Sequence, residues 1–99
     1  MNVSNFTNDK GNKIANQFCI STPEYRMFQS YNSNIVKTTF ENGKRVVYLD
    51  EYYYNYSNTT SKYRNKYLGE TTKEIEAKIK AGIYILTNIN KTKTKQNEH

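Results

Sequence analysis

The chain has 99 residues, one cysteine and one histidine, and its 15 lysines and arginines against 9 acidic residues give a formal charge of +6. One cysteine cannot form an intrachain disulfide, and Cys19 and His99 lack zinc-ligand spacing, which argues against secreted disulfide-rich and zinc-dependent classes. The length fits one domain. No basic start is followed by an apolar run, and no apolar stretch could cross a bilayer, so the sequence predicts a soluble protein of the cytoplasm.

Residues 1–23 are polar and rich in asparagine, with few apolar side chains. Such a composition lacks the apolar density of an independent core, so a flexible or loosely docked N-terminal arm is expected. Ile14 and Phe18 have helical spacing, whereas Phe18 and Ile20 have strand spacing. The secondary structure of this arm therefore stays open.

The first predicted strand runs from Tyr25 to Tyr31, where the pattern alternates after Pro23. A β-hairpin follows, with strands at 34–40 and 45–50. Its central dipeptide Asn42-Gly43 is the preferred sequence of a type I′ turn, because both residues tolerate positive φ.

A two-residue loop fixes the hairpin register, so that Phe40 faces Arg45 and Val36 faces Leu49. One face is expected to meet the core; it carries Val36, Thr38, Phe40, Val47 and Leu49. The other face is expected to point outward; it carries Ile35, Lys37, Thr39, Val46, Tyr48 and Asp50.

Two short helices are predicted next. The first runs from about Thr60 to Leu68 and ends at Gly69, with Tyr63 and Tyr67 four residues apart on its inner face. The second begins at a capping box and ends near a glycine; its residues are Thr71, Glu74 and Gly82, with the expected ion pairs Glu74–Lys78 and Glu76–Lys80.

Residues 83–89 are rich in β-branched side chains and predict a closing strand, whereas residues 91–99 are polar and basic and predict a disordered tail. The sequence thus predicts an α+β domain at 24–90. Its small antiparallel sheet of about four strands, in the order β-β-β-α-α-β, packs with two short helices.

Residues 54–70, YNYSNTTSKYRNKYLGE, resemble a small uncharacterised protein family of phages and plasmids of Gram-positive bacteria. Residues 78–86 resemble the lysine-rich helix end and closing strand of the same family, and the likeness extends over about residues 28–90. The resemblance implies a mobile genetic element as the setting and carries over no catalytic residue. Small accessory proteins of such elements include anti-CRISPR proteins and gene regulators.

Aromatic rings and cations alternate along one segment, a combination that stacks bases and neutralises phosphates of single-stranded nucleic acid. The candidate binding residues are Tyr52, Tyr53, Tyr54, Tyr56, Lys62, Arg64 and Lys66. The same pattern also fits rings that belong to the core and cations on a solvated face. Both interpretations are open from the sequence.

No catalytic, cofactor or metal site is predicted. Asp50 and Glu51 are neighbours in an extended segment, so their carboxylates point apart, and Cys19 has no base near it in the sequence. The leading hypothesis is therefore a non-enzymatic accessory binding protein, anti-CRISPR-like, that occludes a surface of a host defence protein or ribonucleoprotein. The alternative is a basic nucleic-acid-binding accessory or regulatory protein, and a homodimer through the sheet edge or the tyrosines stays open.

Overall fold

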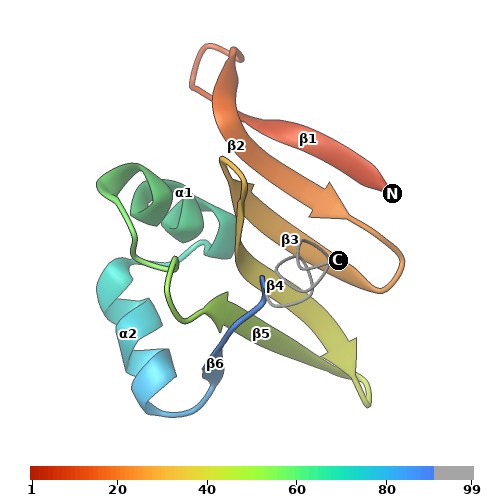
Figure 1. The fold of residues 1–99 in the computed structure, drawn as a ribbon, viewed down its shortest axis with the longest axis vertical. Coiled ribbons are helices and arrows are strands. Elements are labelled where there is room, and N and C mark those ends of the chain that lie inside the picture. Colours follow the sequence, from red (N-terminus) through yellow and green to blue (C-terminus); the bar gives the residue numbers. More distant parts are fainter. Residues whose placement is uncertain (91–99) are drawn as a thin grey trace, which may run out of the picture.

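A computed structural model describes residues 1–90 of the chain, which form one sheet and two helices (Figure 1). The predicted tail at 91–99 lies outside the described residues. The elements, in chain order, are β1 (Asn2–Thr7), β2 (Lys13–Ser21), β3 (Tyr25–Ser30), β4 (Ser33–Glu41), β5 (Lys44–Asp50), α1 (Asn58–Leu68), α2 (Thr72–Lys80) and β6 (Tyr84–Thr87).

The six strands lie in the sheet in the order of the sequence. β1 to β5 form an antiparallel meander, and β6 pairs in parallel with β5 after the crossover through α1 and α2. A parallel neighbour requires a long connection, which the two helices supply. The α+β class is confirmed, but the sheet is mixed and has more strands than the predicted four.

The two additional strands come from residues 1–23, the segment expected as a flexible or loosely docked arm. β2 pairs with both β1 and β3, so most of this segment is built into the sheet. Phe6 and Ile14 of this segment pack against the core, and the ring centroid of Phe6 lies 5.5 Å from that of Phe28 and 5.5 Å from that of Tyr63. Backbone pairing and contacts with residues distant in the sequence therefore hold this segment in the sheet, although its own composition is polar.

The β4–β5 hairpin forms as predicted. Asn42 and Gly43 have φ values of 55° and 79°, as a type I′ turn requires. Phe40 pairs with Arg45 and Val36 with Leu49, which confirms the predicted register.

The core lies between the sheet and the two helices. Its buried members come from four strands and both helices: Phe28, Ile35, Val36, Val47, Leu49, Tyr63, Ile75 and Tyr84. Ser57 caps the start of α1 and Gly69, at φ 70°, follows its end, while Thr71 and Glu74 form the predicted capping box of α2. These caps fix where each helix begins and ends.

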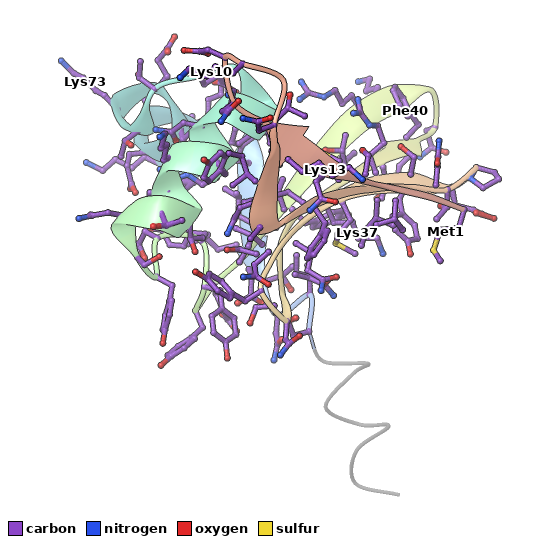
Figure 2. The ribbon with its side chains drawn as sticks, turned by 90° about the horizontal axis from the view of Figure 1, so that it is seen from above. Met1, Lys10, Lys13, Lys37, Phe40 and Lys73 are labelled. Atoms are coloured by element: carbon purple, nitrogen blue, oxygen red, sulfur yellow. The ribbon has the colours of Figure 1, made fainter. Side chains whose placement is uncertain are left out.

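Two expectations about the hairpin faces are wrong. Phe40 was expected in the core, yet its side chain is 73% exposed, because it lies at the end of the hairpin away from both helices (Figure 2). Ile35 and Asp50 were expected to point outward, yet both are buried. A register irregularity between β3 and β4 at Phe28/Gln29 interrupts the alternation, so Ile35 joins Val36 in the core.

The sheet face opposite the helices carries a row that crosses every strand. The paired residues are Val3, Ile20, Met27, Lys37, Tyr48 and Ile85. Directly paired residues project from the same face, so these side chains form one line. Met27 is 8% exposed although it lies outside the core cluster, and Lys37 places one ammonium group near the middle of an otherwise apolar line.

Candidate functional site

The loop between β5 and α1 holds all four predicted tyrosines, and Asp50 fixes its start. One carboxylate oxygen of Asp50 accepts hydrogen bonds from the backbone N–H groups of Tyr52 and Tyr53, at 3.1 and 2.9 Å. The other oxygen accepts from the Ile89 N–H at 3.1 Å and the Asn90 side-chain amide at 2.9 Å. Asp50 is 2% exposed, so its carboxylate is a structural hub.

Three tyrosine rings of this loop pack against one another. The ring centroid of Tyr52 lies 4.7 Å from that of Tyr53 and 6.2 Å from that of Tyr56, and the last two are 5.5 Å apart. Tyr53 also packs against the core, while Tyr52 and Tyr56 are 66% and 64% exposed. We call Tyr52, Tyr53 and Tyr56 the tyrosine cluster. It presents a pre-packed aromatic surface to solvent.

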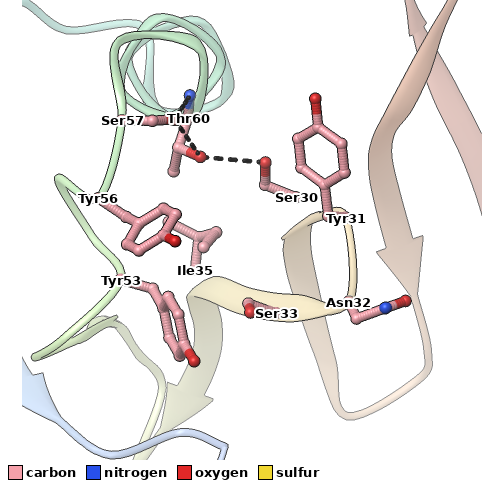
Figure 3. A pocket seen from close by; sticks show the side chains of 9 residues that line it. All are labelled: Ser30, Tyr31, Asn32, Ser33, Ile35, Tyr53, Tyr56, Ser57 and Thr60. Atoms are coloured by element: carbon pink, nitrogen blue, oxygen red, sulfur yellow. Dashed lines mark hydrogen bonds between the residues drawn. The ribbon is translucent and has the colours of Figure 1, made fainter.

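A pocket of about 450 Å³ opens beside the tyrosine cluster, at the start of α1 (Figure 3). Aromatic and hydroxyl side chains dominate its lining, which consists of Ser30, Tyr31, Asn32, Ser33, Ile35, Tyr53, Tyr56, Ser57 and Thr60. Hydrogen bonds of 3.1 Å link Ser57 Oγ to Thr60 Oγ1 and Thr60 Oγ1 to Ser30 Oγ. This chain of hydroxyl groups gives the pocket a rigid polar wall.

Another lining residue, Tyr31, has an unusual backbone conformation. Tyr31 has φ 56°, a left-handed conformation that costs a residue other than glycine roughly 1 kcal/mol or more. The Tyr31 N–H donates to the Asn16 carbonyl at 2.7 Å, and the Tyr31 carbonyl accepts from Gln29 Nε2 at 2.9 Å. These contacts hold a 56% exposed ring next to the pocket.

Tyr54 and Arg64 were both predicted as binding residues, but Arg64 is buried and Tyr54 is half-buried against the core. Arg64 is fully buried and donates to the Tyr54 carbonyl at 2.6 Å, to Asn65 Oδ1 at 2.9 and 3.1 Å, and to Thr72 Oγ1 at 3.1 Å. The Tyr54 hydroxyl donates to Glu76 Oε1 at 3.2 Å. Burial lowers the pKa of Arg64 and raises the pKa of Tyr54.

The two lysines of the predicted set lie on the outer side of α1. Lys62 is exposed, with its Nζ 5.5 Å from the centre of the Tyr63 ring. Lys66 is exposed and donates from Nζ to the Thr7 carbonyl of β1 at 3.4 Å. The seven predicted residues thus divide into three groups: the tyrosine cluster, the buried Arg64 with the half-buried Tyr54, and the two outer lysines.

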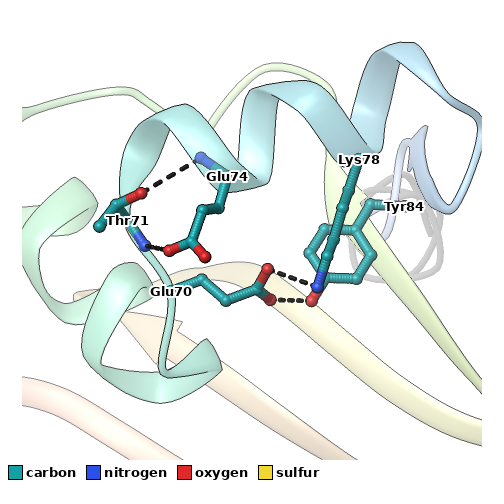
Figure 4. A network of polar contacts seen from close by, with 5 residues as sticks. All are labelled: Glu70, Thr71, Glu74, Lys78 and Tyr84. Atoms are coloured by element: carbon teal, nitrogen blue, oxygen red, sulfur yellow. Dashed lines mark hydrogen bonds and ion pairs between the residues drawn. The ribbon is translucent and has the colours of Figure 1, made fainter.

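A second polar network joins the helices to β6, and no sequence pattern indicated it (Figure 4). The Glu70 carboxylate accepts a short hydrogen bond from the Tyr84 hydroxyl and pairs with Lys78 Nζ at 2.6 Å. Burial, together with the neighbouring Glu70, raises the pKa of Tyr84. The expected pairs Glu74–Lys78 and Glu76–Lys80 are wrong, because Glu70 takes Lys78 while Glu76 accepts from Tyr54.

The described residues offer no support for metal binding or for thiol chemistry. Within residues 1–90, no group of three or more His, Cys, Asp or Glu side chains could hold a metal ion. Burial raises the pKa of the Cys19 thiol, which opposes formation of the nucleophilic thiolate. Neither helix of the described part has the length and apolar character that crossing a membrane requires.

Comparisons with known proteins identify a family and nothing more specific. Searches of curated proteins and of solved structures returned no match. A family model described as a family of unknown function, DUF8033, matches residues 1–82. The matched part contains β1 to β5 and both helices, and β6 lies beyond it. The chain therefore belongs to the DUF8033 family.

Proposed function

We propose that this protein is a non-enzymatic binding protein that acts by covering a surface of a macromolecular partner with its tyrosine cluster. The observation that carries the proposal is the exposure of Tyr52 and Tyr56 on rings that are already packed together. Tyrosine is enriched in the energetic centres of protein interfaces, where a rigid ring buries much area at little entropic cost. The adjacent pocket would receive a side chain of the partner.

The proposed partner is a host defence protein or ribonucleoprotein complex, which the protein would inhibit or modulate as anti-CRISPR proteins do. Support for this choice comes from the resemblance of residues 54–70 to a phage and plasmid family. The formal charge of +6 favours encounter with an acidic protein or nucleoprotein surface.

Nucleic-acid binding by the same region is the second candidate, and the exposure of Lys62 and Lys66 favours it. Arg64 cannot take part, because its guanidinium group is buried and occupied by oxygen acceptors of the protein itself. This loss leaves fewer cations beside the rings than the sequence suggested, so the protein-binding hypothesis ranks first.

Affinity purification with mass spectrometry from a Gram-positive host, together with a plasmid-challenge assay of CRISPR interference, tests the proposal. The wild type is expected to capture a defence component and to lower interference, and the double variant Tyr52→Ala/Tyr56→Ala is expected to do neither. Ile83→Ala is the matched control, since it truncates another exposed apolar side chain, 60% exposed, away from the cluster. Capture of no defence component with unchanged interference would refute the proposal.

A further inference from the structure

A separate surface lies at the far end of the sheet, on the face that the helices cover only in part. Phe40 and Arg45 are directly paired across β4 and β5, and Arg26 of β3 is paired with Thr38, two residues before Phe40 on β4. Because paired residues and second neighbours along a strand project from the same face, all three side chains point the same way. We call Arg26, Phe40 and Arg45 the Arg–Phe surface.

The ring of Phe40 is open to solvent. At 73% exposed it is the most exposed aromatic side chain among residues 1–90. Figure 2 shows it at the end of the hairpin, away from the two helices. A small pocket of about 100 Å³ lies next to the ring, lined by residues that include Arg26, Thr38 and Glu24.

The two arginines lie on either side of this ring; Glu24 lines the same small pocket as Arg26, but no ion pair joins the two side chains. Both arginine side chains are exposed, and neither forms an ion pair within residues 1–90. Arg26 instead lies over the ring of Tyr67, 5.8 Å from its centre. From the spacing of strands and residues in a sheet, the Cα atoms of Arg26 and Arg45 are roughly 12 Å apart, with Phe40 between them.

A cation, an exposed ring and a second cation match the repeating phosphate, base and phosphate of a single nucleic-acid strand. Bases stack on exposed aromatic rings whatever their sequence, and arginines neutralise the phosphates on each side. An acidic peptide could satisfy the two guanidinium groups but offers no regular flat face for the ring. Charge complementarity together with the open ring therefore favours nucleic acid.

We infer that the Arg–Phe surface binds single-stranded nucleic acid, with Phe40 stacking on a base and Arg26 and Arg45 contacting the flanking phosphates. This site lies outside the tyrosine cluster and goes beyond the proposed function. It also differs from the Tyr52–Lys66 segment that the sequence suggested for nucleic acid.

Fluorescence anisotropy with fluorescein-labelled ten-nucleotide thymidine and uridine oligomers, titrated with the purified protein at several salt concentrations, tests the inference. Phe40→Ala and Phe40→Leu are both expected to weaken binding about tenfold, since one stacked base contributes about 1–3 kcal/mol and leucine lacks the ring. Arg45→Ala should weaken binding and reduce the salt dependence by about 0.7 in the logarithmic slope. Both positions are exposed, so these variants should keep the wild-type fold and stability, which circular dichroism melting checks.

Lys10→Ala is the matched control, because it removes one exposed positive charge from the β1–β2 loop, apart from Phe40 (Figure 2). Its affinity should change less than that of Arg45→Ala, and its salt slope should stay close to the wild type. The inference is overturned by absence of binding at low salt, by wild-type affinity of Phe40→Ala, or by equal effects of Lys10→Ala and Arg45→Ala. Loss of oligomer binding in Tyr52→Ala/Tyr56→Ala alone would move the site to the tyrosine cluster. Failure here leaves the proposed function intact, because partner capture is measured separately.

Discussion

Arg64 is the residue at which the sequence-based and structural interpretations differ most. The sequence placed it on a nucleic-acid surface, whereas the structure buries it completely and satisfies its guanidinium group with three acceptor groups. The acceptors belong to Tyr54, to Asn65 and to Thr72 at the start of α2. Arg64 thus joins the β5–α1 loop to both helices.

Replacing Arg64 by alanine should destabilise the fold by about 3–4 kcal/mol. Hydrogen bonds that involve a charged group contribute about 1.5–3 kcal/mol, and each buried acceptor left without a donor costs about 1–3 kcal/mol. Loss of the buried aliphatic stem adds a cavity term. Arg64→Lys keeps the charge but cannot reach the same set of acceptors, so a loss of about 2 kcal/mol is expected.

Urea denaturation gives the free energy of unfolding and thermal denaturation gives the melting temperature; circular dichroism follows both. A domain of this size loses about 4–8 °C of melting temperature per kcal/mol, so Arg64→Ala should melt at least about 12 °C below the wild type. Lys62→Ala, on the exposed side of the same helix, should change stability by less than about 0.5 kcal/mol. The reasoning is refuted if Arg64→Ala loses less than about 1 kcal/mol, or if it stays stable and loses only partner or nucleic-acid binding.

Three further predictions concern the supports of the fold. Asp50→Asn should lower the unfolding free energy by about 2–3 kcal/mol in urea denaturation, because an amide nitrogen then faces backbone N–H donors. A normal stability would contradict the hub role. Gly69→Ala should lower the unfolding free energy by about 1 kcal/mol in the same assay. The φ of Gly69 is 70° and no atom lies within 4 Å of an added Cβ, so the loss comes from backbone strain and not from a steric clash. Hydrogen bonds from Thr71 lower the pKa of Glu74, so the carboxylate stabilises the fold at neutral pH, and this contribution is lost as pH falls below about 4.5. Glu74→Ala should therefore show a shallower loss of unfolding free energy between pH 7 and pH 3, and an unchanged acid profile would contradict it.

The sequence predicted features whose causes lie within a few neighbouring residues. The Asn42-Gly43 turn sets its own dihedral angles, and the capping box of Thr71 and Glu74 satisfies backbone groups only three residues apart. Both were confirmed, and the hairpin register followed from the turn. Features that neighbouring residues determine can therefore be recognised from the sequence.

Features that depend on distant contacts were missed. β1 joins the sheet through pairing with β2 and through Phe6, which meets Tyr63 far along the chain. Phe40 has the alternation of a core residue, but alternation cannot tell how far the helices reach over the sheet. Lys78 has helical spacing to Glu74, yet Glu70 outside the helix is its partner.

The candidate site was predicted in part for the same reason. A run of adjacent tyrosines guarantees that some rings are exposed, and Tyr52 and Tyr56 are. The adjacent pocket also includes Ser30 at the end of β3 and Tyr31 of the β3–β4 turn, which no local sequence pattern connects to the tyrosine loop. Arg64 was misplaced because arginine is rarely buried, and its acceptors become visible only when α2 folds back on α1.

The row across the open face of the sheet has a consequence for how copies of the chain meet. An apolar band on one side of a sheet invites a second sheet to stack on it. Lys37 stands within that band, paired with Met27 on one side and Tyr48 on the other. In a symmetric stack centred on this residue, two lysine ammonium groups would be buried next to each other. The like charges therefore oppose self-association through this face, whereas a partner with an acidic group could still bind there.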